Sequence, residues 1–227
     1  MARKEKIPNE VQKRFARNVR QRKENFRAKR QYYLIVCEGE KTEPNYFNAL
    51  KQDLPKGVLT AVQIDIKGTG RNTQSLIDEA LRLKAHYEDT ANHPLDRLWT
   101  VFDRDSFNEK DFNAAIMRCK NEKIGCAWSN EAFELWYLLH FELYSNGQNR
   151  TDYPKLIEKN VRKNIKQYQY RKNSEDMYAL LKPKMKDAIR HAKQLDKMYG
   201  TREDFAAHNP RTTVYQLVQE LLKISNQ

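Results

Sequence analysis

The chain has 227 residues, 39% hydrophobic and 32% charged, which predicts a globular protein with one α/β domain and an appendage. No apolar run approaches the ~18 residues of a membrane span, and the basic N-terminus lacks the apolar segment of a secretory signal. The three cysteines show neither zinc-site nor disulfide spacing, so we expect a reduced protein of the cytoplasm.

The first thirty residues carry most of the net charge. Residues 1–30 account for +9 of the total of +12, and the rest of the chain is nearly neutral. A basic arm ahead of a near-neutral body indicates a polyanion as partner, which makes Arg14, Arg17 and Arg20 candidates for contact with nucleic acid. The alternative is a flexible, solvated tail that only aids solubility.

Residues 31–47, QYYLIVCEGEKTEPNYF, predict a strand, an acidic turn and a helix. Residues 32–37 are an unbroken apolar run, typical of a strand buried on both faces. Pro44 suits the first turn of a helix, which we expect over residues 44–53. In an open parallel sheet, functional groups lie past the carboxyl ends of the strands, and Glu38 stands there.

A second strand is expected at residues 58–66 and a helix at residues 74–90, joined by a glycine loop. Backbone N–H groups at the start of a helix attract phosphate, so Lys67 and Arg71 in this loop are candidates for phosphate contact. A plain strand-to-helix turn is the alternative, because the loop matches no known phosphate-binding motif.

A third strand at residues 98–102 ends in Asp103-Arg104-Asp105. Residues two apart on an extended segment point the same way, so Asp103 and Asp105 would face one point, together with Glu38 if the two strands are neighbours. Three close carboxylates repel one another unless a cation lies between them, and such hard oxygen ligands suit Mg²⁺ or Mn²⁺. We expect Arg104 to point away and form an ion pair.

A helix at residues 108–121, a strand at residues 123–128 and an apolar helix at residues 131–141 follow. Alternating strands and helices predict an α/β fold with a parallel sheet. Glu134 lies where the other acids should gather, as a metal ligand or a support; alternatively, it only favours the helix dipole. We expect His140 to be a structural histidine rather than a base.

Residues 146–227 are expected to form a helical extension that packs back on the core, with a kink or break at Pro183 and a final helix over residues 214–224. Lys163 and Lys166 are candidates for nucleic-acid contact here, because basic residues alternate with tyrosines that suit stacking on unpaired bases. An ordinary charged helix face is the alternative. The tyrosines are Tyr153, Tyr168, Tyr170 and Tyr178.

Four segments, CEGEKTEPNYF, VFDRDSF, SNEAFELWYLLHF and NPRTTVYQL, resemble the RloB family (RloB/AbiL-type proteins), whose members have a Toprim-like domain. The resemblance extends from Tyr33 to the final helix and implies a Toprim-like catalytic domain over residues 31–145. It also implies a metal-dependent nuclease of bacterial anti-phage defence, of the abortive-infection type, with an ABC-type ATPase as partner. One departure from the family pattern is Glu131, which stands where proline is expected.

The expected chemistry is phosphodiester hydrolysis with Mg²⁺ (or Mn²⁺). Asp103 and Asp105 would hold the metal, and Glu38 would bind metal or act as general acid/base. Glu43 and Glu134 are candidates for binding a second metal, and Glu40 is a weaker candidate.

Lys41, beside the acidic turn, is a candidate for stabilising phosphate charge, although a solvent-exposed lysine is the simpler interpretation. RNA, such as transfer RNA, is favoured over DNA as substrate. The alternative function is a non-catalytic nucleic-acid-binding or sensing subunit of an ATPase defence complex. The sequence does not determine the oligomeric state, and a homo-oligomer is one possibility.

Overall fold

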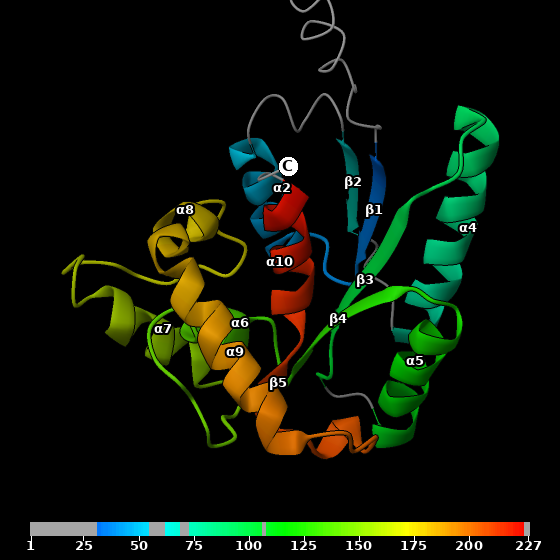
Figure 1. Ribbon diagram of the computed structural model, residues 1–227. Helices are drawn as coiled ribbons and strands as arrows, with labels where there is room; N and C mark the ends of the chain where they lie inside the picture. Colours follow the sequence, from blue (N-terminus) through cyan, green and yellow to red (C-terminus); the bar gives the residue numbers. More distant parts are fainter. Residues whose placement is uncertain (1–30, 55–61, 69–72, 106–107, 225–227) are drawn as a thin grey trace, which may run out of the picture. The chain divides into compact units, whose positions relative to one another are not determined.

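The apolar run at the start of the acidic motif forms β1 (Gln31–Cys37), which lies inside a five-stranded sheet of order β2-β1-β3-β4-β5 (Figure 1). The first four strands are parallel, and β5 is antiparallel to β4. The predicted alternation of strands and helices in an α/β fold is therefore confirmed. The other strands are β2 (Val62–Gly68), β3 (Arg97–Asp103), β4 (Gly125–Asn130) and β5 (Arg211–Thr212).

Alternate residues of β1 enter two separate hydrophobic clusters, one on each face of the sheet. Ile35 and Cys37 belong to the larger cluster, and Leu34 and Val36 belong to the smaller one. Residues of α4 (Thr73–Ala91) and α5 (Glu109–Asn121) supply the smaller cluster. The larger cluster draws on α2 (Thr42–Asp53), α6 (Glu134–Leu138), α7 (Tyr153–Val161), α8 (Met177–Leu181), α9 (Met185–Tyr199) and α10 (Val214–Ile224).

The structure, a computed structural model, describes residues 31–54, 62–68, 73–105 and 108–224. Five basic candidates from the sequence fall wholly or partly outside this description. Arg14, Arg17, Arg20 and Arg71 lie outside the described residues, and for Lys67 only the strand backbone is described. No described helix combines the length and the apolar character that crossing a bilayer would take.

The strand predicted at residues 123–128 is displaced, and the helix predicted at residues 131–141 is shorter than expected. Strand β4 continues to Asn130 because its last residues pair with the end of β3, where Ser129 lies opposite Asp103 and its carbonyl accepts from Arg104 N–H at 2.9 Å. The helix that follows is only the short α6, Glu134–Leu138. The structure has a cis peptide bond between Asn130 and Glu131.

The helical extension expected over residues 146–227 also contains a short strand. Arg211 and Thr212 form β5, which pairs with Asn130 and Ser129 at the edge of β4, and the hydroxyl oxygens of Ser129 and Thr212 are 3.0 Å apart. A strand of two residues shows no alternation that a sequence pattern can detect. The expected return of the final helix to the core is confirmed by the buried Leu217, Val218 and Leu221 of α10.

Two further expectations for this region can be compared with the structure. Within the expected helical extension, residues 152–170 are helical only in α7, which ends at Val161. Pro183 interrupts the next helical stretch as predicted, because residues 182–184 form a 3₁₀ turn, η1 (Lys182–Lys184), between α8 and α9. A second such turn is η2 (Phe205–Ala207).

Candidate metal centre

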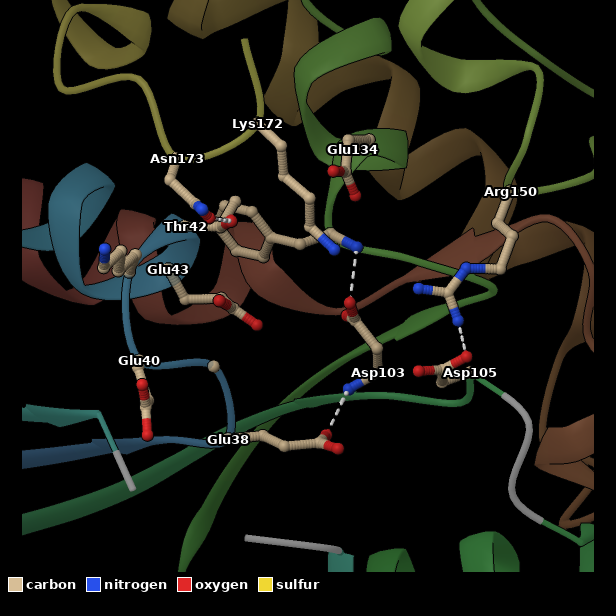
Figure 2. Close-up of a pocket in the computed structure, with 13 residues that line it drawn as sticks. Glu38, Glu40, Thr42, Glu43, Asp103, Asp105, Glu134, Arg150, Lys172 and Asn173 are labelled. Carbon is tan, nitrogen blue, oxygen red and sulfur yellow. Dashed lines mark hydrogen bonds and ion pairs between the residues drawn. The ribbon is translucent and has the colours of Figure 1, made fainter. Parts of the chain in front are cut away.

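Glu38 and Asp103 meet at the carboxyl edge of the sheet, as the neighbouring strands predict. Cys37 of β1 pairs with Val101 of β3, and the Val101 carbonyl accepts from Glu38 N–H at 2.8 Å. The carboxylate of Glu38 turns back over β3, where its Oε2 accepts from Asp103 N–H at 3.2 Å (Figure 2). The first residue after β1 and the last residue of β3 are therefore directly linked.

Asp103 is partly buried at this edge of the sheet. Its Oδ2 accepts from the N–H of Phe133 at 2.9 Å, immediately before α6. Its Oδ1 is buried and has no hydrogen-bond partner in the described part of the chain. Burial, followed by the charges of Glu43 and Glu134, raises the pKa of Asp103 well above its usual range. A buried carboxylate oxygen without a partner indicates that a group belongs there.

Glu43 approaches Asp103 from the first turn of α2 and is 6% exposed. Burial, together with the charge of Glu134, raises the pKa of Glu43 to about 7, and the charge of Lys172 opposes that rise. The turn between β1 and α2 fits closely around this carboxylate, because a β-carbon added to Gly39 would collide with Glu43 Oε2. Glycine at position 39 therefore lets the turn pack against the acid.

Two further carboxylates complete the cluster. Burial raises the pKa of Glu38 to about 7, although the hydrogen bond from Asp103 N–H opposes that rise. Glu134 is 9% exposed at the start of α6, and its Oε1 accepts from the hydroxyl of Tyr170 at 3.0 Å. Figure 2 shows Glu43, Asp103 and Glu134 turned toward one space, which fits the predicted position of Glu134.

Asp105 lies at the same pocket but does not point to the same place as Asp103. The chain leaves extended geometry after β3, and Asp105 adopts a left-handed backbone conformation with φ 43°. Its carboxylate forms an ion pair with Arg150 (Figure 2). The two-residue alternation therefore fails after Asp103. Arg104 points away and pairs with Glu109 at 3.4 Å, as predicted.

The carboxylates line a cavity of about 430 Å³ that also receives positive charge. Arg150 and Lys172 line it, and sequence reasoning missed both because they lie in irregular segments of a chain rich in basic residues. The segment that bears Lys172 is tied to α2 by Asn173, whose Oδ1 accepts from Thr42 Oγ1 at 2.7 Å and whose carbonyl accepts from Asn45 Nδ2 at 2.9 Å.

The donor set suits a hard divalent cation. Four of the six carboxylates that line the cavity, with one buried oxygen that has no partner among the described residues, match the oxygen ligands of Mg²⁺ or Mn²⁺. In the described residues, no three His, Cys, Asp or Glu side chains already have the mutual geometry of a metal site. A bound ion would therefore draw these carboxylates closer together. They are Glu38, Glu43, Asp103 and Glu134.

The remaining candidates lie farther from Asp103. Glu40 and Lys41 line the cavity and are exposed at its rim. Lys163 and Lys166 are exposed in the turn after α7 and do not line it, and Lys163 Nζ donates to Asn160 Oδ1 at 2.7 Å. These two lysines could contact only a ligand that extends beyond the cavity.

Burial leaves only two of the four tyrosines predicted to stack on bases available for stacking. Tyr153 and Tyr178 are 0% and 4% exposed, so neither can stack on a base, whereas Tyr168 and Tyr170 are partly exposed. His140 is structural, as predicted: it is buried, its Nδ1 lies 2.9 Å from the Trp136 carbonyl oxygen, and burial lowers its pKa to about 4.

Comparisons with known proteins give one match. The family model described as RloB-like protein matches residues 33–221, a range that contains every carboxylate of the cavity. No curated protein and no solved structure matches the chain.

Proposed function

We propose that this chain, which belongs to the RloB-like protein family, is a metal-dependent nuclease that hydrolyses phosphodiester bonds. The observation that carries the proposal is the buried Oδ1 of Asp103, which has no hydrogen-bond partner in the described part of the chain and lies in a cavity that Glu38, Glu43 and Glu134 also line. Clustered acids repel phosphate, so a protein that only bound nucleic acid would gain nothing from them. We favour RNA, such as transfer RNA, over DNA, and a Toprim-like origin of the domain.

Each charged group of the cavity has a role in this proposal. Asp103, Glu43 and Glu134 would hold Mg²⁺ (or Mn²⁺), which when bound neutralises phosphate charge and orients water. Arg150 and Lys172 bind the non-bridging oxygens of the phosphate.

Glu38 is suited to proton transfer. With a pKa of about 7 it is partly ionised at neutral pH, so its carboxylate takes a proton from the attacking water.

Family membership is the support for the wider role. We propose that the nuclease is the effector of a bacterial anti-phage, abortive-infection system, that it acts in the cytoplasm, and that an ABC-type ATPase is its partner. Co-expression with such an ATPase, followed by affinity purification and a phage-infection assay, tests both statements. Absence of co-purification and of protection would refute them.

One observation favours a second function, a non-catalytic nucleic-acid-binding or sensing subunit of an ATPase complex. Asp105, which the sequence predicts as a metal ligand, is neutralised by an ion pair with Arg150. The two functions differ in whether phosphodiester bonds are cut.

The decisive experiment incubates the purified full-length protein with RNA and DNA in Mg²⁺ and maps the cuts. Asp103→Asn keeps the size of the side chain and the acceptor for Phe133 N–H, but removes the charge, so cleavage should fall by ~100-fold or more. Glu122→Gln is the matched control, because Glu122 is exposed outside the cavity. Equal cleavage by Asp103→Asn and the wild type would refute the proposal that this site is a metal-dependent nuclease.

A further inference from the structure

A second cavity of about 300 Å³ adjoins the acidic one, and its size lies at the lower end of small-ligand pockets. Glu134, Arg150 and Lys172 line both cavities, so the two spaces meet at these side chains. The second cavity adds an aromatic and two small or apolar walls. The residues that line it alone are Tyr170, Pro154 and Ala132.

Tyr170 is held in a fixed position at this cavity. Its backbone N–H donates to Glu158 Oε1 at 2.9 Å, and its hydroxyl donates to Glu134 Oε1 at 3.0 Å. The side chain is partly exposed and packs against the larger hydrophobic cluster. A flat ring restrained at both ends gives up little freedom when another flat group stacks on it.

Cations stand where the two cavities meet. The N–H of Arg150 donates to Glu131 Oε2 at 3.0 Å and its guanidinium pairs with Asp105, so the residue is anchored at both ends. Lys172 precedes Asn173, which is tied to α2. Figure 2 shows both cations directed into the acidic cavity from separate segments. An anionic group bound between the cavities would therefore meet positive charge from two sides.

We propose that the second cavity binds the base of the nucleotide next to the scissile phosphate, so that the substrate is unpaired at that position. The inference rests on the proposed function, which places that phosphate at the acidic cavity. Tyr170 offers a stacking face that every base can use, and Arg150 and Lys172 contact the phosphates that flank the sugar. A base in a duplex must first leave its stack, which is least unfavourable for an unpaired one.

Binding measurements on full-length Asp103→Asn protein in Mg²⁺ test this without strand cleavage. The probe is a short fluorescent single-stranded RNA, with its paired duplex for comparison. Adding Tyr170→Leu should weaken single-strand binding roughly 5- to 150-fold, the scale of removing one base stack, and Tyr170→Phe should keep most of it. Tyr168→Leu is the control, because Tyr168 is partly exposed nearby but lines neither cavity.

A change in the ligand adds a test in which the folded parent protein supplies the first result. RNAs with one abasic sugar at successive positions should bind the parent protein less well at one position, and Tyr170→Leu should abolish that difference. Equal binding of strand and duplex by the parent, or an abasic effect unchanged by Tyr170→Leu, would overturn the proposal. If the wild type cleaves RNA but Tyr170→Leu does not change the abasic effect, only the proposed base pocket is refuted. If Tyr170→Leu abolishes the abasic effect but the wild type cleaves nothing, only the proposed nuclease activity is refuted.

Discussion

Glu43→Gln should stabilise the metal-free protein at alkaline pH. The pKa of Glu43 is about 7 in the folded chain against 4.5 for an ordinary glutamate, so the folded state binds the proton more tightly than the unfolded state. Stability is therefore lost as pH rises from 4.5 through 7. At about 1.4 kcal/mol per pKa unit, the ionised carboxylate costs the fold up to about 3.5 kcal/mol above pH 7. Glutamine removes that cost and keeps an acceptor for nearby N–H groups.

Urea unfolding in EDTA measures the effect. At pH 8 the variant should gain ~1–3 kcal/mol, or roughly 3–10 °C in Tm, and at pH 5 less than about 1 kcal/mol. With Mg²⁺ the order should reverse, because the wild type gains ligand-binding energy that the variant does not. Glu122→Gln should stay within ~0.5 kcal/mol at both pH values. A Glu43→Gln protein that is less stable at pH 8, or whose gain is independent of pH, would refute the reasoning.

Three other perturbations probe separate parts of the site. Glu38→Gln should lower turnover ~100-fold or more with nucleic-acid affinity held or tightened, measured by single-turnover cleavage and anisotropy; retained turnover would exclude Glu38 as the base. Arg150→Met should release Asp105 from its ion pair, so Mg²⁺ binding measured by calorimetry should tighten roughly 2- to 5-fold. The KM for the nucleic acid should rise. Weaker Mg²⁺ binding would contradict the idea that Arg150 neutralises Asp105. Deleting residues 1–30 should flatten the salt dependence of binding by roughly 0.7–0.9 log units for each phosphate that the arm neutralises, and an unchanged slope would show that the arm is only a tail.

The central part of the site could be predicted because it depends on strand geometry. Parallel strands bring their carboxyl ends to one edge, so an acid just after β1 and an acid at the end of β3 had to be neighbours, and Glu38 and Asp103 are. Glu134 followed from the same rule applied to β4. The apolar runs that identify these strands are long enough to be distinctive.

The rest of the site depends on contacts between distant, irregular segments. Nothing in the local sequence distinguishes Arg150 and Lys172 from the other basic residues, because their placement comes from the ion pair with Asp105 and the bonds from Asn173 to α2. The direction of Asp105 was mispredicted because a left-handed residue follows no alternation. Strand β5 escaped detection because its partner strand is remote and its length is two residues.

The pairing of β5 with β4 also bears on how the chain is synthesised. Ser129 and Thr212 are separated by 83 positions, so the ribosome completes β4 long before its neighbour exists. During that interval β4 presents an open edge, and unpaired strand edges recruit other chains into aggregates. Fragments truncated between these two strands should therefore self-associate. A nascent chain of this protein should need shielding, as by a holdase chaperone, until β5 and α10 have been made.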